Sequence, residues 1–270
     1  MSERFPRYFD GLIDAFRAGR VGRFVHLGAW DDPPTSATMA EPGAFERAQA
    51  RLNDRLLALA DLADGQCVAD VGCGFGGTLE AVDARHRDMA LVGINIDGRQ
   101  LAICRSLRAR RDNTLRWMRA DACALPLADA SVERVLCFEA MFHFGSRRRF
   151  FMEAARVLVP GGVLVASDIL LRAAPGGADA ALQRTVCEGF GPWPDFWGAD
   201  ADHRALAAEA GLACTDYFDV ADATLPSHVF TAPSGAPPRG LVGRASAALA
   251  MLHRSGRLRY PLARFERPHA

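Results

Sequence analysis

The chain has 270 residues, half of them hydrophobic and 24% charged, which is ordinary for a soluble globular protein with one substantial core and a small accessory layer. Thirty-two basic residues balance thirty-two acidic ones, so no overall field favours nucleic acid or an anionic membrane as a partner. The sequence has no lysine, which excludes Schiff-base and P-loop lysine chemistry. These properties favour a small, neutral partner.

The seven cysteines include no C-x-x-C pair, and most lie in apolar runs, as reduced core residues do in cytosolic proteins. The N-terminal stretch MSERFPRYFDGL has no apolar core of a signal peptide, and no run is long enough to span a membrane. We therefore expect a cytoplasmic protein with no membrane partner. The chain allows a homodimer, but no pattern in it predicts one.

Residues 1–66 are predicted to form a largely helical lid region, with an aromatic amphipathic piece near 5–18 and a long helix from about 43 to 63. From Cys67 onward, short apolar runs alternate with helical periods, which predicts a mostly parallel sheet with right-handed crossovers. The candidate strands are CVADV (67–71), ALVGIN (90–95), LRWMRA (115–120), VERVLCF (132–138), GVLVAS (162–167), LACTDYFDV (212–220) and GRLRYPLARF (256–265). Seven strands in a single α/β domain follow from this pattern.

The stretch 172–204 breaks the alternation, because it is rich in glycine, proline and large aromatics without a clean period. We interpret it as an inserted cap. Four aromatic residues in it predict a closing wall around a bulky apolar substrate: Phe190, Trp193, Phe196 and Trp197. Simple packing of the cap on the core is the alternative explanation for this cluster.

A glycine-rich loop follows the first strand. The sequence VADVGCGFGG places Asp70 near the strand end and Gly72, Gly74 and Gly76 at the turn into a helix, where backbone can approach a ligand closely. Together with Gly77 the loop also fits G-x-G-x-x-G, so a dinucleotide is a competing cofactor. A carboxylate here would repel a pyrophosphate and attract an ammonium group. Asp70 therefore favours S-adenosylmethionine over NAD.

Two further positions could read the adenine of such a cofactor. The segment RADACALP offers the Asp121 side chain and the Ala122 backbone after the third strand, where an amino group and a ring nitrogen could be recognised. The alternative for Asp121 is an Asx turn that begins the following loop.

Five segments, in order, carry a family resemblance: ADVGCGFGG, GINIDGRQ, RADACALPL, CFEAMFHF and RVLVPGGVLVASD. They resemble the signature segments of class I S-adenosylmethionine-dependent methyltransferases, most of all the small-molecule group that includes the rebeccamycin sugar O-methyltransferase and the tocopherol methyltransferases. The resemblance implies a Rossmann-like fold, a cofactor-binding core over 67–270, and an enzyme of specialised metabolism. The early segment LGAW compares with LGYW in that group, which implies a cofactor contact at Trp30 although Ala29 departs from the pattern.

Many family members hold the cofactor ribose with an acid at the position of Asn95, but a subset with G-I-N-I turns carries a glutamine five residues later, as Gln100 does here. An amide both donates and accepts, so Asn95 and Gln100 can satisfy two ribose hydroxyls without a buried charge. Ile96 belongs to the same cofactor-binding turn. Asp97 is predicted to be the N-cap of a helix that begins at Gly98.

The chemistry is expected at His143 and Asp168. Methyl transfer needs alignment of acceptor and methyl carbon, and a hydroxyl acceptor also needs a proton acceptor, usually a neutral imidazole. His143 follows the fourth strand and Asp168 ends the fifth, at the ligand edge of such a sheet. The resemblance implies that Asp168 orients the imidazole or takes the proton itself. The alternative for His143 is a residue of the pocket wall, and the alternative for Asp168 is a cap of the following turn. Glu139 is expected to line the methionine end of the cofactor.

The sequence thus predicts a small-molecule methyltransferase, with oxygen as the expected acceptor atom. Methylation of carbon or nitrogen is the nearest alternative, and a cyclisation on the same fold is an alternative from another class. A NAD-dependent oxidoreductase is more distant. No His, Cys and Asp spacing matches a metal site, so no metal is expected.

Overall fold

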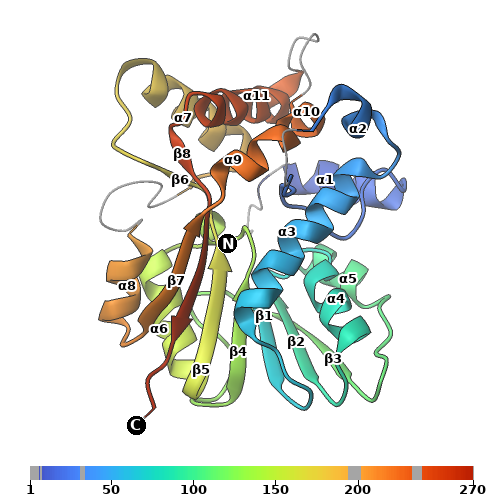
Figure 1. Ribbon diagram of the computed structural model, residues 1–270, viewed down its shortest axis with the longest axis vertical. Helices are drawn as coiled ribbons and strands as arrows, with labels where there is room; N and C mark the ends of the chain where they lie inside the picture. The colour runs from blue at the N-terminus through green and yellow to red at the C-terminus, as the bar shows by residue number, and fades with distance from the viewer. Residues whose placement is uncertain (1–5, 7, 31–33, 194–201, 233–238, 270) are drawn as a thin grey trace.

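We describe the fold from a computed structural model, over residues 6, 8–30, 34–193, 202–232 and 239–269. A seven-stranded sheet in the order β3-β2-β1-β4-β5-β9-β7 is flanked by helices (Figure 1). Its strands are β1 (Cys67–Val71), β2 (Ala90–Asn95), β3 (Thr114–Arg119), β4 (Val132–Cys137), β5 (Leu158–Ser167), β7 (Ala213–Asp219) and β9 (Pro261–Glu266). All seven candidate strands are therefore confirmed.

The sheet is mostly parallel, as expected. Strands β1 to β5 run parallel to one another, whereas β9 runs antiparallel to both β5 and β7. Alternate residues of β5 enter two different hydrophobic clusters, with Val163 and Val165 in one and Leu164 and Ala166 in the other. Both faces of this central strand are thus covered, which explains its unbroken apolar sequence.

Helices fill the crossovers and the N-terminal region. The longer ones are α1 (Tyr8–Arg17), α3 (Ala44–Ala60), α4 (Gly77–Arg85), α6 (Arg147–Val157), α7 (Gly177–Phe190) and α11 (Gly240–Arg254). The shorter ones are α2 (Ser36–Ala40), α5 (Gly98–Cys104), η1 (Met141–His143), α8 (His203–Glu209), α9 (Ala221–Thr224), η3 (Leu225–Ser227) and α10 (His228–Thr231). None of the helices in the described ranges is long and apolar enough to cross a membrane.

A cap layer lies beyond the carboxyl edge of the parallel strands, at the top of Figure 1. It combines α7 with α9, α10 and α11, and a small antiparallel pair, β6 (Leu170–Leu171) and β8 (Leu258–Arg259), joins its two chain segments to the core. The layer is therefore larger than the 172–204 insertion expected from sequence. The sequence also missed helix α7, because glycine and proline at its borders obscure a helical run of fourteen residues.

Helices α7 and α11 pack closely because a glycine lies at their crossing. A Cβ on Gly189 would lie 2.4 Å from the Cβ of Ala245 and 2.6 Å from the carbonyl oxygen of Leu241. Contacts this short are repulsive, so the small residues at this point set the distance between the two helices.

We therefore predict that Gly189→Ala destabilises the protein by about 1–3 kcal/mol, the usual cost of overpacking. The measurement is the free energy of unfolding in urea. Gly11→Ala in the middle of α1 is the matched control, because nothing lies within 4 Å of its added Cβ. The control should be neutral or stabilising by up to about 1 kcal/mol. Equal effects of the two variants would contradict close packing at Gly189.

Candidate functional site

The glycine loop joins β1 to α4 and takes backbone conformations that favour glycine. Gly72, Gly74 and Gly76 have φ of +81°, +52° and +84°. A Cβ on Gly72 would lie 2.4 Å from the Cβ of Ala140, and the Gly72 amide donates to the carbonyl of Ile94 at 2.8 Å. The loop is thus pressed between neighbouring turns of the carboxyl edge, and its backbone forms a cradle.

Asp70 lies in β1 just before this loop and is almost fully buried. Burial raises the pKa of its carboxyl group to about 7. A cationic group of a ligand placed beside Asp70 would favour the ionised form and gain from the low dielectric around it. The position therefore suits an ammonium group, as predicted from sequence.

Residues 23–27 cover the glycine loop. The Arg23 guanidinium donates to the carbonyl of Phe75 at 2.7 Å, and a Cβ on Gly74 would lie 3.2 Å from Val25. The Leu27 amide donates to Glu139 at 3.0 Å, which ties the covering segment to the end of β4. Sequence reasoning missed Arg23, because nothing local in the chain links it to Phe75.

Trp30 does not belong to this cover. Its indole N–H donates to Ser227 Oγ at 3.2 Å, its ring stacks on Phe230 at 5.8 Å between centroids, and it packs with Ala44 and Ala48 of α3. These contacts hold the N-terminal segment to the cap. The cofactor contact expected at Trp30 stays a prediction, and Val25 lies beside the loop at Gly74.

The turn after β2 brings Asn95 and Gln100 together. Their amide side chains are buried and 3.4 Å apart, with Asn95 donating to Gln100. Asp97 is confirmed as the N-cap of α5, because it accepts from the Arg99 amide at 2.9 Å. Ile96 is 43% exposed at the tip of this turn. A pair of neutral amides therefore occupies the turn after β2.

Asp121 forms an Asx turn, which was the alternative prediction for this residue. Its carboxylate accepts from the Cys123 amide at 2.8 Å, while the residue itself stays exposed and Ala122 is buried. One carboxylate can cap a turn and still accept from a ligand, so the turn does not exclude adenine recognition.

Glu139 is held in the left-handed region, with φ of +46°, directly after β4. Its carboxylate accepts from the Tyr260 hydroxyl at 2.5 Å and from the Leu27 amide. Burial raises the pKa of Glu139 to about 7, against the opposing effect of these two donors. The strained backbone and the three converging segments fix this acid at the centre of the carboxyl edge.

His143 ends η1, and an aromatic cluster surrounds its imidazole. The Tyr8 hydroxyl lies 2.5 Å from His143 Nε2, and the rings of Phe9, Phe142 and Trp193 all contact the histidine. Burial lowers the pKa of His143 to about 3, although the charge of Asp168 opposes this shift. The imidazole is therefore neutral at physiological pH. Sequence reasoning missed Tyr8, which lies near the N-terminus, 135 residues before His143.

His143 also lines a cavity of about 430 Å³ with Phe144, Gly145, Cys187, Pro192 and Trp193. Phe190 stacks on Trp193 with centroids 6.0 Å apart. Two of the four aromatic residues predicted to form the wall are thus at or beside the cavity. The other two, Phe196 and Trp197, lie outside the described residues.

Asp168 is not hydrogen-bonded to His143 in the described structure. Its carboxylate pairs with the Arg147 guanidinium, with Nε 2.6 Å from Oδ2, and accepts from His203 Nε2 at 3.0 Å and from the Ile169 amide at 2.9 Å. Burial would raise the pKa of Asp168, but Arg147 and His203 hold it below its ordinary value. The expected direct orientation of His143 by Asp168 is therefore absent, because these other donors use its oxygens.

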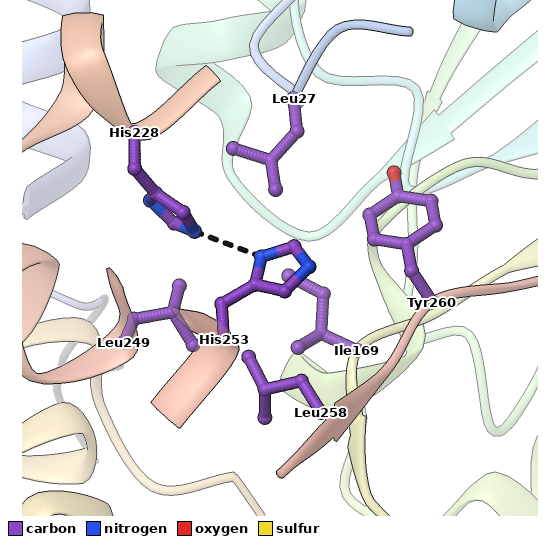
Figure 2. Close-up of a pocket in the computed structure, with 7 residues that line it drawn as sticks. All are labelled: Leu27, Ile169, His228, Leu249, His253, Leu258 and Tyr260. Carbon is purple, nitrogen blue, oxygen red and sulfur yellow. Dashed lines mark hydrogen bonds between the residues drawn. The ribbon is translucent and has the colours of Figure 1, made fainter. Parts of the chain in front are cut away.

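A histidine pair, His228 and His253, lies between cap and core (Figure 2). His253 Nε2 donates to the Ala221 carbonyl at 2.8 Å, and burial lowers the pKa of both His228 and His253. With both rings neutral, His253 Nδ1 accepts from His228 Nε2 at 3.0 Å. Around the pair lie Leu27, Ile169, Leu249, Leu258 and Tyr260, with no room for a water molecule. This cluster stabilises the junction and leaves no space for a ligand.

Within the described residues, no group of three or more His, Cys, Asp or Glu side chains is arranged to hold a metal ion. What the carboxyl edge offers is a glycine cradle with a buried acid, a pair of amides and a neutral imidazole on a cavity. This combination can bind a cationic nucleoside and accept a proton from a molecule in the cavity.

The Arg147 and Asp168 pair gives a stability prediction. Both side chains are fully buried, so Asp168→Asn breaks a buried ion pair and should cost about 3–5 kcal/mol in urea unfolding. Asp129→Asn is the control, because that carboxylate is 78% exposed and pairs with Arg156 at the surface. The control should cost less than about 1 kcal/mol. A small loss in Asp168→Asn would contradict a structural role for the pair.

Comparisons with known proteins identify the family of this chain. The methyltransferase domain family matches residues 69–166. The chain is 35% identical over 210 residues to 27-O-demethylrifamycin SV methyltransferase of Amycolatopsis mediterranei (strain S699), which covers 76% of this chain and 72% of that relative.

Two solved structures share the fold over nearly the whole chain. One is geranyl diphosphate C-methyltransferase from Streptomyces coelicolor A3(2), solved with Mg²⁺, geranyl diphosphate and S-adenosyl-L-homocysteine. Its TM-score is 0.73 at 18% identity, and the alignment covers 96% of this chain and 98% of that protein. The [4+2]-cyclase SpnF has a TM-score of 0.72 at 22% identity and covers 98% and 94%. The chain belongs to the class I S-adenosylmethionine-dependent methyltransferases, in the group that acts on small molecules.

Proposed function

We propose that this enzyme transfers a methyl group from S-adenosylmethionine to a hydroxyl group of a natural-product acceptor. The observation that carries the proposal is the neutral imidazole of His143 on the aromatic cavity at the carboxyl edge. The relative that methylates 27-O-demethylrifamycin SV, by its name, supports oxygen as the acceptor atom.

The residues of the carboxyl edge fit the cofactor. The buried carboxylate of Asp70 is suited to bind the ammonium group of the cofactor. The glycine loop at Gly72, Gly74 and Gly76 allows the protein backbone to approach the amino-acid portion of the cofactor closely. Asn95 and Gln100 can hold the ribose hydroxyls.

Four further residues complete the proposed cofactor site. Asp121 and the Ala122 backbone are assigned to the adenine, with Ile96 exposed beside it as an apolar contact. Glu139 is assigned to the methionine end, because it lies between β4, the covering segment at Leu27 and Tyr260.

When bound, the cofactor supplies a methyl group on a sulfonium, whose C–S bond breaks with its electron pair staying on sulfur as the new C–O bond forms. The protein must align the acceptor hydroxyl and remove its proton. His143 is proposed as the proton acceptor. Asp168 acts at a distance, since its negative charge favours the imidazolium while its oxygens bind Arg147 and His203.

The cavity supports a bulky apolar acceptor. Phe144, Pro192 and Trp193 line it, and Phe190 backs the Trp193 ring. An aromatic wall excludes water from the reacting hydroxyl and stacks on rings or flat macrocycles. A protein or nucleic-acid acceptor would need an open charged groove instead.

The fold shared with a [4+2]-cyclase favours one alternative, a non-methyl reaction on the same scaffold. An assay distinguishes methylation from a non-methyl reaction. It combines the purified enzyme with S-adenosylmethionine and a panel of hydroxylated macrocycles, beginning with 27-O-demethylrifamycin SV. Methylation requires S-adenosylhomocysteine to form in step with an O-methylated product. Conversion of an acceptor without S-adenosylhomocysteine would support the cyclase reading, and a methylated carbon or nitrogen would correct the acceptor atom.

The ribose assignment gives a binding prediction. Gln100→Ala should weaken the affinity for S-adenosylhomocysteine by roughly 1–3 kcal/mol, since a buried polar group of the ligand loses its partner. Titration calorimetry measures the dissociation constant. Arg105→Ala, an exposed change directly after α5, is the control and should leave the constant unchanged. Equal affinities for wild type and Gln100→Ala would remove Gln100 from the ribose site.

The base assignment gives a kinetic prediction. With a hydroxyl acceptor, His143→Ala should lower kcat by about 10² to 10⁴ and leave the affinity for S-adenosylhomocysteine unchanged. His86→Ala is the control. His86 lies at the end of α4, and its ring is 3.4 Å from the Asp64 carboxylate. An acceptor that is already ionised needs no base, so a loss that vanishes as the assay pH rises would indicate an acidic phenol. Full activity of His143→Ala at every pH would refute the assignment.

A further inference from the structure

The lid helix α1 places a second proton-bearing group on the candidate base. Tyr8 is the first residue of α1, and its hydroxyl lies 2.5 Å from His143 Nε2, with the two rings stacked at 5.5 Å between centroids. Both residues are half-buried. What Tyr8 does there rests on the proposed role of His143.

Contacts along the whole of α1 fix the position of Tyr8. Next to it, Phe9 packs edge-on against His143, and the Phe190 ring packs edge-on against Tyr8 itself. Two residues after Tyr8, Asp10 pairs with Arg99, which also binds the Asp97 cap of α5. Tyr8 is therefore held between the acceptor cavity and the ribose-binding turn.

The far end of α1 rests on the cofactor cradle. Ile13 is buried against Phe75 of the glycine loop and Ile103 of α5, and Phe16 packs on the same cluster. The surface pair of Asp10 and Arg99 contributes little by itself, so this apolar contact carries most of the attachment. The elements that bind the cofactor thus also position Tyr8.

The protonation of the two groups allows the phenol to be the hydrogen-bond donor. Burial and the charge of Glu139 raise the pKa of Tyr8 well above its ordinary value, and burial keeps His143 neutral. The phenol therefore keeps its proton. With the neutral imidazole protonated on Nδ1, the tautomer on which the relay depends, the phenol donates a hydrogen bond to the lone pair on Nε2. That lone pair is the one a base would use, so an incoming hydroxyl meets the phenol oxygen and not the imidazole.

We propose that Tyr8 is a catalytic residue that passes the acceptor proton to His143. The acceptor hydroxyl gives its proton to the Tyr8 oxygen while the Tyr8 proton moves to Nε2. The electron pair of the broken O–H bond forms the new bond between the acceptor oxygen and the methyl carbon. The electron pair of the broken C–S bond remains on sulfur. The phenol is regenerated, and the proton ends on the imidazole.

The charge balance of the site favours this route. The reaction removes one positive charge from the sulfonium and creates one on the imidazole, so the net charge of the closed site does not change. A phenolate is only transient, because each proton that leaves Tyr8 is replaced from the acceptor. The negative charge of Asp168 stabilises the imidazolium that forms.

The first test needs no substrate. Long-range ¹H–¹⁵N spectra of the full chain with S-adenosylhomocysteine report the protonation of each imidazole nitrogen, and the His143 signals are assigned by their loss in His143→Gln. Wild type should show a protonated Nδ1 and a hydrogen-bonded, unprotonated Nε2 at neutral pH. Tyr8→Phe should shift the Nε2 signal, whereas Tyr217→Phe, a tyrosine of β7 beside Arg204, should not. An unshifted Nε2 in Tyr8→Phe would overturn the proposed contact.

The second test measures turnover with an acceptor that wild type methylates. Tyr8→Phe should lower kcat by about 10 to 10³, with the affinity for S-adenosylhomocysteine unchanged, and combining it with His143→Ala should add little further loss. Tyr217→Phe should keep wild-type kcat. An unchanged or higher kcat in Tyr8→Phe would mean that the phenol only covers the base until the acceptor displaces it, and would overturn the relay.

The outcomes separate the two proposals. Loss of activity in His143→Ala with full activity in Tyr8→Phe rejects the relay and leaves the base in place. Retained activity in His143→Ala rejects the base, and the relay falls with it. If wild type methylates no hydroxyl in the panel, the proposed function fails together with the relay, whatever the spectra show of the Tyr8 contact.

Discussion

The parallel pairing of five strands is the constraint on which the rest of this structure depends. Because β1 to β5 run in the same direction, their carboxyl ends reach one edge of the sheet together. The turns that leave this edge contain the glycine loop, the amide pair, the strained Glu139 and His143. Parallel strands also require crossover helices on the sheet faces, so the edge is the place left for a ligand. The lid region and the cap then close that edge from above.

The three acids of the edge are accommodated in three different ways. Asp70 is buried beside the glycine loop with its pKa raised, and a cationic ligand is what would stabilise its charge. Glu139 accepts from a phenol and an amide, which partly offset its burial. Asp168 has a guanidinium and an imidazole as donors and keeps its charge. Neighbouring carboxylates with such different surroundings can serve binding, positioning and stability separately.

The cover over the edge comes from both ends of the chain. Helix α1 brings Tyr8 and Phe9 to His143, and residues 23–27 close over the glycine loop. The cap contributes α7 and α11, which meet at Gly189, and the histidine pair fixes its junction with the core. Access to the cavity is therefore controlled by segments that are far apart in sequence.

Local patterns in the sequence were sufficient for the sheet and for the cofactor loop. Apolar runs separated by helical periods define the strands, because burial on both faces of a parallel sheet demands uninterrupted apolar residues. The N-cap at Asp97 and the glycines at Gly72, Gly74 and Gly76 follow from backbone requirements within a few residues. The five ordered segments likewise identify the family, since each combines such a turn with its strand.

Only the tertiary structure decided which side chains meet. Asp168 binds Arg147 and not His143, because a buried guanidinium needs its charge balanced and the fold brings the first residue of α6 to the end of β5. Tyr8 reaches His143 from 135 residues away, Trp30 turns to the cap, and α7 forms where glycine and proline hide its period. Short-range preferences act between neighbours in the chain, whereas these contacts depend on how whole elements pack. The sequence therefore determined the scaffold and its cofactor loop, and packing determined the partners of the candidate base.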